Sequence, residues 1–531
     1  IVKGLKRMEY RGYDSVGVAT ESDNKIELKK GIGKVNEVNS KIQLDSLPGK
    51  IGIGHTRWAT HGKVTEFNAH PHPSNSGKIA IVHNGIIENF EELKKQLEDE
   101  GYNFKSETDS EIIANLLQKH YEKTKNVKET ILKTVSEIKG HYAFVAMFEN
   151  GQLVAAKFHE PLIIGVGKDD FFLSSDVLGF IEFTDDAIYL ENGNFVILEK
   201  NKFQILDFQG EHVKYGITKV SKEFGDVYKG DYAHFTLKEI HEQYETVLKA
   251  GEKTQEAIEK TANYIKHAKN IYITGSGTSY NSALIAKQIF SKYAKIKAEP
   301  IISSELQFSP NSIEENSIII AISQSGESAD VLDAVRIGKE SNCKVIAIVN
   351  LMTSSLAREA DVVIGMNCGP EIGVAATKSF TSQLVVLYKI VQKLTDNKVT
   401  INFEKFSESV LKILENPTKI KKIAKVLKDI SDIYVLGRGI NYPIAMEAAL
   451  KLKELTYIHA EGIPGGELKH GPLALMDSNV FVIIINPNDS TYSDTLTSAR
   501  EIKARGAKII GVSDIESNVY DYWIEMPKID Q

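Results

Sequence analysis

The second half of the chain repeats itself, and this repeat constrains the fold more than any other feature. The segment IYITGSGTSYNSALIAK, which begins at Ile271, is echoed by IYVLGRGINYPIAMEAALK from Ile433. IIIAISQSGES, from Ile318, is echoed by VFVIIINPNDST from Val480. Self-similarity over so long a period indicates two copies of one domain.

Each copy alternates short apolar runs with amphipathic segments long enough for helices. In the first copy the runs are 271–274, 318–322, 345–349 and 362–364. Strands separated in this way predict a parallel sheet with helical crossovers, which is an α/β domain. The first copy closes with a helical pattern that ends near Leu394, and its counterpart in the second copy would lie beyond Gln531. We therefore expect the second copy to lack its closing helix.

The first half of the chain is richer in strands than in helices. Strand patterns cover 50–54, 78–85, 142–148, 153–158 and 195–200, and helical patterns lie near 88–101 and 110–138. This mixture predicts an α+β domain with a substantial sheet. The domains are expected at 1–230, 248–397 and 398–531, with a linker at 231–247 between the first two.

Charge and cysteine content exclude several classes of protein. The 531 residues include 64 Lys and Arg against 71 Asp and Glu, a net charge of −7, so the chain has no basic footprint for nucleic acid or membrane surfaces. Two cysteines, Cys343 and Cys368, make no disulfide framework and are too few for a zinc cluster unless histidines supply the other ligands. With no signal peptide and no apolar run of about 18 residues, we expect a cytoplasmic protein without metal or cofactor.

Two hydroxyl-rich turns in the first copy predict a phosphate site. Glycines let backbone N–H groups approach an anion, and neighbouring hydroxyls grip it without a net charge. The turns contain Ser276, Gly277, Thr278 and Ser279, and Ser323, Gln324, Ser325 and Ser328. The alternative is that each hydroxyl only caps a helix. The second copy has lost these hydroxyls, so we expect phosphate in the first copy alone.

A charged stripe in the second copy predicts acid–base chemistry. Glu447, Lys451 and Glu454 are spaced to share one helix face, within a segment apolar enough to enter a core. The alternative is a solvated face with an i,i+4 ion pair. His470 follows a Gly-Gly turn, and a lone histidine is more often structural.

The first half carries a second set of polar candidates. Arg57, in the segment HTRWATHG, can hold a carboxylate bidentately. Asn84 and Gly85 follow a strand and could form an oxyanion hole from a side-chain amide and a backbone N–H. Residues 108–111, Thr-Asp-Ser-Glu, are expected to form a capping box. Taken singly, each of these residues has an adequate structural explanation.

Taken together, the motifs resemble one family along essentially the whole chain. GSGTSYNS, SQSGESADV, EIGVAATKSFTSQL and EAALKLKELTYIHAEGIPGGELKHGPLALMD are similar to the sugar-isomerase (SIS) domains of the glucosamine-6-phosphate synthase family. EYRGYDSVG, HTRWATHG, HNGIIEN and ETDSEI resemble the glutaminase of the same family. The resemblance implies an α+β N-terminal-nucleophile glutaminase domain followed by two tandem α/β SIS domains with parallel sheets. It also implies transfer of the glutamine amide nitrogen to fructose 6-phosphate, giving glucosamine 6-phosphate for amino-sugar (UDP-N-acetylglucosamine) synthesis.

The resemblance assigns roles in the sugar site. Glu454 would move the proton between C1 and C2, and His470 would assist ring opening in the neighbouring subunit of a homodimer or larger homo-oligomer. The residues that would line the site are Val374, Ala376, Glu447 and Lys451, together with the two hydroxyl-rich turns.

In the glutaminase, Arg57 would bind the glutamine carboxylate and Asp109 its amino group, with Asn84 and Gly85 as the oxyanion hole. Trp58 would gate an ammonia channel, Thr60 and His61 would contact the substrate, and Arg11 would support the nucleophile. The family's nucleophilic cysteine precedes the motif EYRG, and its imine-forming lysine lies near the C-terminus. Neither is present, so we expect a chain truncated at both ends that makes no glucosamine 6-phosphate.

Two other functions fit parts of the sequence. SIS domains also occur in non-catalytic sugar-phosphate regulators, although a regulator has no need of a glutaminase half. Another amidotransferase of the same N-terminal class would carry a nucleotide-binding loop, and the sequence contains none.

Overall fold

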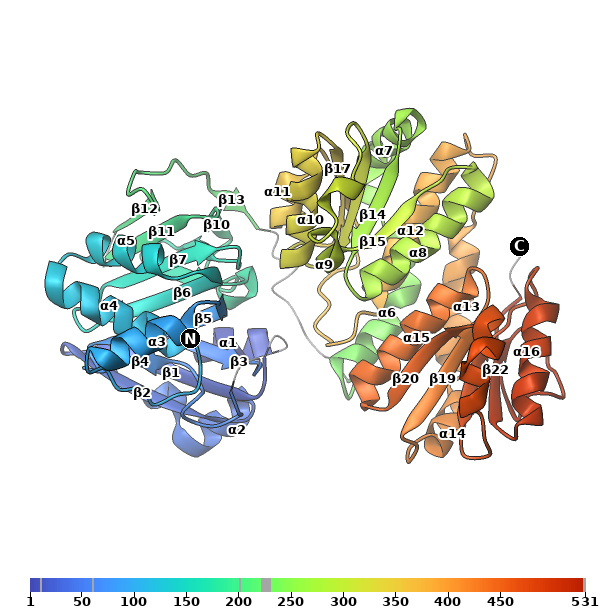
Figure 1. Cartoon of the computed structure of the whole chain (residues 1–531), viewed down its shortest axis with the longest axis horizontal. Coiled ribbons are helices and arrows are strands. Elements are labelled where there is room, and N and C mark those ends of the chain that lie inside the picture. Colours follow the sequence, from blue (N-terminus) through green and yellow to red (C-terminus); the bar gives the residue numbers. More distant parts are fainter. Residues whose placement is uncertain (10–11, 60–61, 200–201, 221–230, 529–531) are drawn as a thin grey trace. The chain divides into compact units, whose positions relative to one another are not determined.

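The computed structural model describes residues 1–9, 12–59, 62–199, 202–220 and 231–528 of the chain. Contacts divide it into two compact units, Ile1–Val227 and Tyr228–Gln531 (Figure 1). None of the helices in the described ranges is both long and apolar enough to cross a membrane.

Unit 1 is built on a six-stranded antiparallel sheet with the order β12-β11-β7-β6-β5-β4. Its strands are β4 (His72–Pro73), β5 (Ile79–Ile87), β6 (Gly140–Phe148), β7 (Leu153–Phe158), β11 (Asn194–Glu199) and β12 (Lys202–Asp207). Successive residues alternate between two cores: Ile79 and Ile81 pack with the helices, whereas Ala80 and Val82 pack with the other sheets. Because side chains alternate across a strand, both faces of this sheet are covered.

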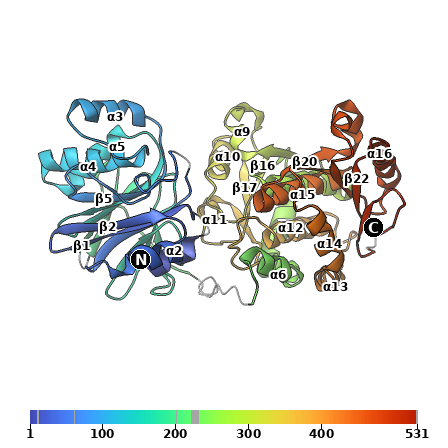
Figure 2. The ribbon, with the colours of Figure 1, turned by 90° about the horizontal axis from the view of Figure 1, so that it is seen from below.

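Three helices cover one face of this sheet: α3 (Phe90–Asp99), α4 (Ser110–Thr124) and α5 (Val127–Glu137) (Figure 2). The other face packs on two smaller sheets, which comprise β1 (Ser15–Ser22), β2 (Lys25–Ile32) and β3 (Ile51–Arg57), and β8 (Ile163–Val166), β9 (Phe171–Ser174), β10 (Asp186–Tyr189) and β13 (Thr218–Lys219). Helices α1 (Val2–Met8) and α2 (Val35–Ile42) complete the unit. The expected α+β architecture is confirmed.

Two local expectations change in the structure. The helical pattern at 110–138 forms two helices, because Lys125 is left-handed (φ 51°) and Asn126 caps α5 by accepting from the N–H of Glu129. The prediction of a capping box at residues 108–111 is wrong. The Glu111 carboxylate instead accepts from the N–H groups of Lys105 and Ser106, since this buried acid is needed by the preceding turn.

Unit 2 contains two five-stranded parallel sheets with the same strand order, which confirms the repeat. The first runs β15-β14-β16-β17-β18, with β14 at Ile271–Gly275, β15 at Glu299–Ile302, β16 at Ile318–Ser323, β17 at Lys344–Val349 and β18 at Val362–Gly365. The second runs β20-β19-β21-β22-β23, with β19 at Asp432–Gly437, β20 at His459–Pro464, β21 at Phe481–Ile485, β22 at Lys508–Ser513 and β23 at Tyr522–Glu525.

The helices of unit 2 bring the two copies together. Helix α8 (Thr278–Ile289), which follows the first strand of copy one, packs against α15 (Asn441–Thr456), which follows the first strand of copy two. The other main helices are α6 (Phe235–Lys249), α7 (Gln255–His267), α10 (Ala329–Glu340), α12 (Lys378–Leu394), α13 (Phe403–Glu415), α14 (Thr418–Val426) and α16 (Tyr492–Ala504). Helix α6 occupies most of the stretch assigned to the linker and packs on α12 and α13.

Candidate functional site

A cavity of about 2030 Å³ in unit 1 gathers most of the predicted glutamine site. Arg57 and Trp58 line it at the end of β3, and Asn84 and Gly85 line it from β5. Asp109, the residue that precedes α4, lines it as well. Residues that lie far apart in the sequence therefore line the same cavity. The predicted residues Arg11, Thr60 and His61 lie outside the described residues.

The cavity holds two opposite charges at its buried side. Burial lowers the pKa of Arg57, while the carboxylates of Asp14 and Asp109 act in the opposite direction. Asp109 Oδ2 accepts a hydrogen bond of 2.7 Å from the N–H of Ile87, which fixes the carboxylate against β5. A cation and an anion in one pocket complement the two charged groups of a free amino acid.

Asn84, one of the two predicted oxyanion-hole residues, has a side-chain partner that the sequence analysis did not identify. His55 Nε2 lies 2.8 Å from Oδ1 of Asn84. Burial lowers the pKa of His55 to about 4, so the ring is neutral near pH 7, and its Nε2–H donates to the amide oxygen. The amide N–H₂ of Asn84 is thereby left to donate elsewhere. The period-two spacing of His55 and Arg57 places both side chains on one face of β3, but it does not indicate the contact with Asn84.

Gly85 is required by its backbone. It has φ +108°, and a Cβ there would lie 2.0 Å from the carbonyl oxygen of His141 on β6. Trp58 stands at the cavity with its ring exposed and packs edge-on against Tyr13 at 5.2 Å.

In unit 2 the two hydroxyl-rich turns follow β14 and β16, which are adjacent in the sheet. Ser323 Oγ accepts from the N–H of Gly326, and Ser325 Oγ accepts from the N–H of Glu327. Ser328 precedes α10, but we find no side-chain cap hydrogen bond to it among the described residues. The capping alternative therefore does not account for Ser328.

Two of the predicted hydroxyls turn into the protein. Thr278 Oγ1 donates to Glu447 Oε1 at 2.9 Å, and Ser279 Oγ accepts from the Gln383 amide at 3.3 Å. Both residues are buried in the first turn of α8. Ser276, Gly277 and Gln324 lie in the turns at the carboxyl ends of β14 and β16; Ser276 and Gly277 are exposed, and Gln324 is half-buried.

The charged stripe on α15 is one connected cluster. Lys451 Nζ lies 2.5 Å from Glu454 Oε2 and 3.4 Å from Glu447 Oε1, so the predicted common face is confirmed. Lys451 also donates to Thr278 Oγ1 at 3.1 Å. Glu447 is only 4% exposed and accepts a further 2.8 Å bond from Asn281. The i,i+4 ion pair of the alternative explanation is present, but the face is not fully solvated, because Glu447 is buried against Thr278 and Asn281 of the first copy.

The remaining predicted residues lie on loops. His470 ends the 3₁₀ helix Gly465–His470 and is exposed. Val374 and Ala376 lie in the loop between β18 and α12, with Val374 50% exposed. The two cysteines are buried and unbridged.

Two protein families match the chain. The glutamine amidotransferase domain family matches residues 55–181, and the SIS domain family matches 264–392 and 426–520. Among full-length relatives, the glutamine–fructose-6-phosphate aminotransferase [isomerizing] of Methanothermobacter thermautotrophicus is 42% identical over 97% of this chain and 87% of its own length. Its namesake from Pyrococcus horikoshii is 42% identical over 100% of this chain and 91% of its own.

Among solved structures, the C-terminal domain of glucosamine-fructose-6-phosphate aminotransferase from Francisella tularensis matches with a TM-score of 0.50 and 36% identity. The match covers 56% of this chain and 91% of that one.

Proposed function

The chain belongs to the isomerising glutamine–fructose-6-phosphate aminotransferases, and on that premise we propose how its two units divide the reaction. The enzyme transfers the amide nitrogen of glutamine to fructose 6-phosphate and isomerises the product to glucosamine 6-phosphate. We assign the release of ammonia to unit 1 and its capture by the sugar to unit 2. A non-catalytic regulator is not favoured.

In unit 1, Arg57 takes the α-carboxylate of glutamine and Asp109 its ammonium group. When a nucleophile attacks the side-chain amide, negative charge develops on the amide oxygen. The N–H₂ of Asn84 and the N–H of Gly85 stabilise that charge, and His55 keeps the Asn84 amide in the orientation that donates. Trp58, and by family resemblance Arg11, Thr60 and His61, complete this site.

In unit 2, the turns after β14 and β16 bind the sugar phosphate through Ser276, Gly277, Gln324, Ser325 and their neighbours. Val374 and Ala376 contact the sugar from the loop after β18. Thr278 and Ser279 support the cradle through their buried bonds, since their hydroxyls are already engaged.

Glu454 is the base that moves a proton between C1 and C2. A carboxylate suits this step when it lies beside the carbon acid and out of bulk water. Lys451 holds Glu454 on one side and Thr278, next to the phosphate turn, on the other. This bridge between the acid–base helix of copy two and the phosphate turn of copy one is the observation that carries the proposal.

We further propose that the protein is a cytoplasmic homodimer or larger homo-oligomer, in which His470 of each subunit serves its neighbour's sugar site. Exposure of His470 on a short helical turn is compatible with that role. The domain boundaries at 230, 247 and 397 also remain a proposal.

The test is Glu454→Gln in protein expressed from its complete reading frame. We expect exchange of the C1 and C2 protons of the sugar with solvent to fall by about 100-fold, in the range of a lost acid–base group. Glutamine hydrolysis should persist. Glu415→Gln, an exposed acid at the end of α13, serves as the matched control. Exchange that continues near the wild-type rate would assign the base to another group.

A further inference from the structure

The loop that connects β18 to α12 is held in place by side chains of helix α6. Residues 366–377 connect β18 to α12 and lie at the carboxyl edge of the first parallel sheet, where the phosphate turns also lie. The loop carries Val374, an apolar side chain that is 50% exposed. Because loops without partners are mobile, a binding loop needs something that fixes its backbone.

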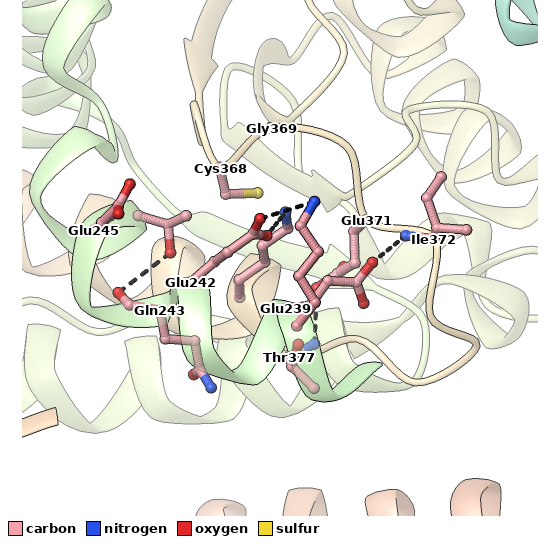
Figure 3. A network of polar contacts seen from close by, with 12 residues as sticks. Glu239, Glu242, Gln243, Glu245, Cys368, Gly369, Glu371, Ile372 and Thr377 are labelled. Carbon is pink, nitrogen blue, oxygen red and sulfur yellow. Dashed lines mark hydrogen bonds and ion pairs between the residues drawn. The ribbon is translucent and has the colours of Figure 1, made fainter. Parts of the chain in front are cut away.

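Glu239 of α6 supplies the first clamp. Its side chain is 2% exposed, and its Oε1 accepts hydrogen bonds of 2.5 and 3.0 Å from the N–H groups of Ile372 and Gly373. Oε2 accepts from the same Gly373 N–H at 3.1 Å. Figure 3 shows Glu239 reaching from α6 to the backbone of Ile372. One buried carboxylate thus fixes the two residues that precede Val374.

The fit around this clamp is tight. A Cβ on Gly373 would lie 2.5 Å from Glu239 Oε2 and 2.5 Å from Thr236 Oγ1. No real Cβ sits so close, so a side chain at position 373 would push the loop away from α6. Gly373 is therefore needed for close approach and not for an unusual φ.

A second pair of contacts anchors the end of the loop. Lys378, the first residue of α12, is 3% exposed and lies 2.6 Å from Glu242 of α6. Glu371 accepts from the N–H groups of Thr377 and Ser379 at 2.9 and 3.1 Å, which satisfies donors at the start of α12. The loop is held on both sides of Val374 and Ala376.

We propose that Glu239 is a positioning residue for the sugar site: through Ile372 and Gly373 it sets where Val374 and Ala376 meet the sugar. The inference rests on the proposed function, since that is what places these two residues against fructose 6-phosphate. Glu239 itself touches no reacting atom. Displacement of a substrate contact by about 1 Å can cost up to 100-fold in rate, so the effect is measurable.

The experiment compares Glu239→Ala, Glu239→Gln and Gly373→Ala in the enzyme from the complete reading frame. We expect the KM for fructose 6-phosphate to rise about 10-fold or more in Glu239→Ala and in Gly373→Ala. Glu239→Gln should fall between wild type and Glu239→Ala, because its amide oxygen still accepts in the place of Oε1. Glutamine hydrolysis without sugar should stay at the wild-type rate in all three. Glu245→Gln, on the same helix but paired with Lys249, is the control.

Two results would overturn the inference. One is an unchanged KM for the sugar in both Glu239→Ala and Gly373→Ala, whatever happens to the melting temperature, since that would make the contacts merely structural. The other is a loss of glutamine hydrolysis by the same factor as the rise in the KM for fructose 6-phosphate, since that would mean that the substitution disturbs the whole fold. If Glu239→Ala does not fold, Gly373→Ala and Glu239→Gln still decide. Ser325→Ala distinguishes failure of the proposed phosphate site from failure of the proposed role of Glu239. If Ser325→Ala leaves the affinity for fructose 6-phosphate unchanged, the phosphate site itself is wrongly assigned. If Ser325→Ala weakens that affinity and the loop variants do not, only the role of Glu239 is wrong.

Discussion

Unit 1 should be acid-labile well above the pH at which carboxylates are protonated. Four histidines, His55, His70, His72 and His83, gather beside the proposed oxyanion hole. His70 stacks on His55 with ring centroids 4.3 Å apart and meets His72 edge-on at 4.6 Å. Burial lowers the pKa of all four rings; the neighbouring histidines lower the pKa of His70 further, and the cation of Lys30 lowers that of His72 further.

The sign of the effect follows from the direction of these shifts. The pKa of His55 and of His83 is lowered to about 4 in the folded protein, against an ordinary value of 6.5. Between pH 6.5 and 4 the unfolded chain therefore binds protons on these histidines that the folded unit does not bind. The free energy of unfolding decreases as the pH falls below 6.5. At pH 5 His55 and His83 each cost about 2 kcal/mol, about 4 kcal/mol together, and the lowered pKa values of His70 and His72 act in the same direction. That is a large part of the total stability of a domain, about 5–15 kcal/mol.

The two tryptophans allow unit 1 to be followed by itself. Trp58 belongs to unit 1 and Trp523 to unit 2, so Trp523→Phe leaves one reporter. Urea unfolding in this background between pH 7.5 and 5 should show a free energy of unfolding that falls by at least about 2 kcal/mol per pH unit near pH 5.5, from His55 and His83 alone. Adding His70→Leu should make that slope shallower, because one fewer buried histidine then takes up a proton on unfolding.

His212→Gln is the control, since His212 is exposed in the same unit. Its slope should equal that of the parent. A parent whose stability is flat between pH 7 and 5 would refute the reasoning, as would a His70→Leu slope equal to that of the control. Either result would mean that the four rings are protonated in the folded unit and that water reaches them.

Two further predictions concern catalysis in protein from the complete reading frame. His55→Leu should lower kcat for glutamine hydrolysis by about 10-fold to 100-fold with little change in KM, because a freed Asn84 amide no longer reliably donates to the oxyanion, and His55→Gln should recover part of the loss. Equal rates for the two variants would exclude an orienting role. Mixing inactive Glu454→Gln and His470→Ala subunits should restore product formation to about a quarter of the wild-type rate if His470 acts across a dimer interface, and to none if it acts within its own subunit.

Much of the architecture follows from periodicity in the sequence. The offset between Gly275 and Gly437 predicts two copies of one sheet, and the strand orders agree. The spacing of Glu447, Lys451 and Glu454 predicts a common helix face, and the ion pairs confirm it. These features are local or repeat at a fixed interval, so the sequence alone carries them.

Contacts between distant segments could not be predicted in this way. Glu111 fits the pattern of a capping box, yet its carboxylate accepts hydrogen bonds from the N–H groups of Lys105 and Ser106 in the turn before α4. His55 and Glu239 look ordinary in the sequence. Their importance comes from partners on β5 and on the loop after β18, and no spacing rule links those positions. Positioning residues are thus harder to predict than the residues that they position.

The two copies of the α/β domain have diverged in complementary ways. Copy one keeps hydroxyl-rich turns at the ends of β14 and β16, whereas copy two has Arg438 and Asn486 at the corresponding places. Copy two instead carries charge on α15, the counterpart of α8. Because α8 and α15 pack on each other, Lys451 Nζ on α15 lies 3.1 Å from Thr278 Oγ1 in the first turn of α8. A single domain has only one helix after its first strand, and that helix would have to serve both tasks. In the proposed function, duplication lets one copy bind the phosphate while the other supplies the base, and the buried Glu447 joins the two helices through its hydrogen bonds to Thr278 and Asn281.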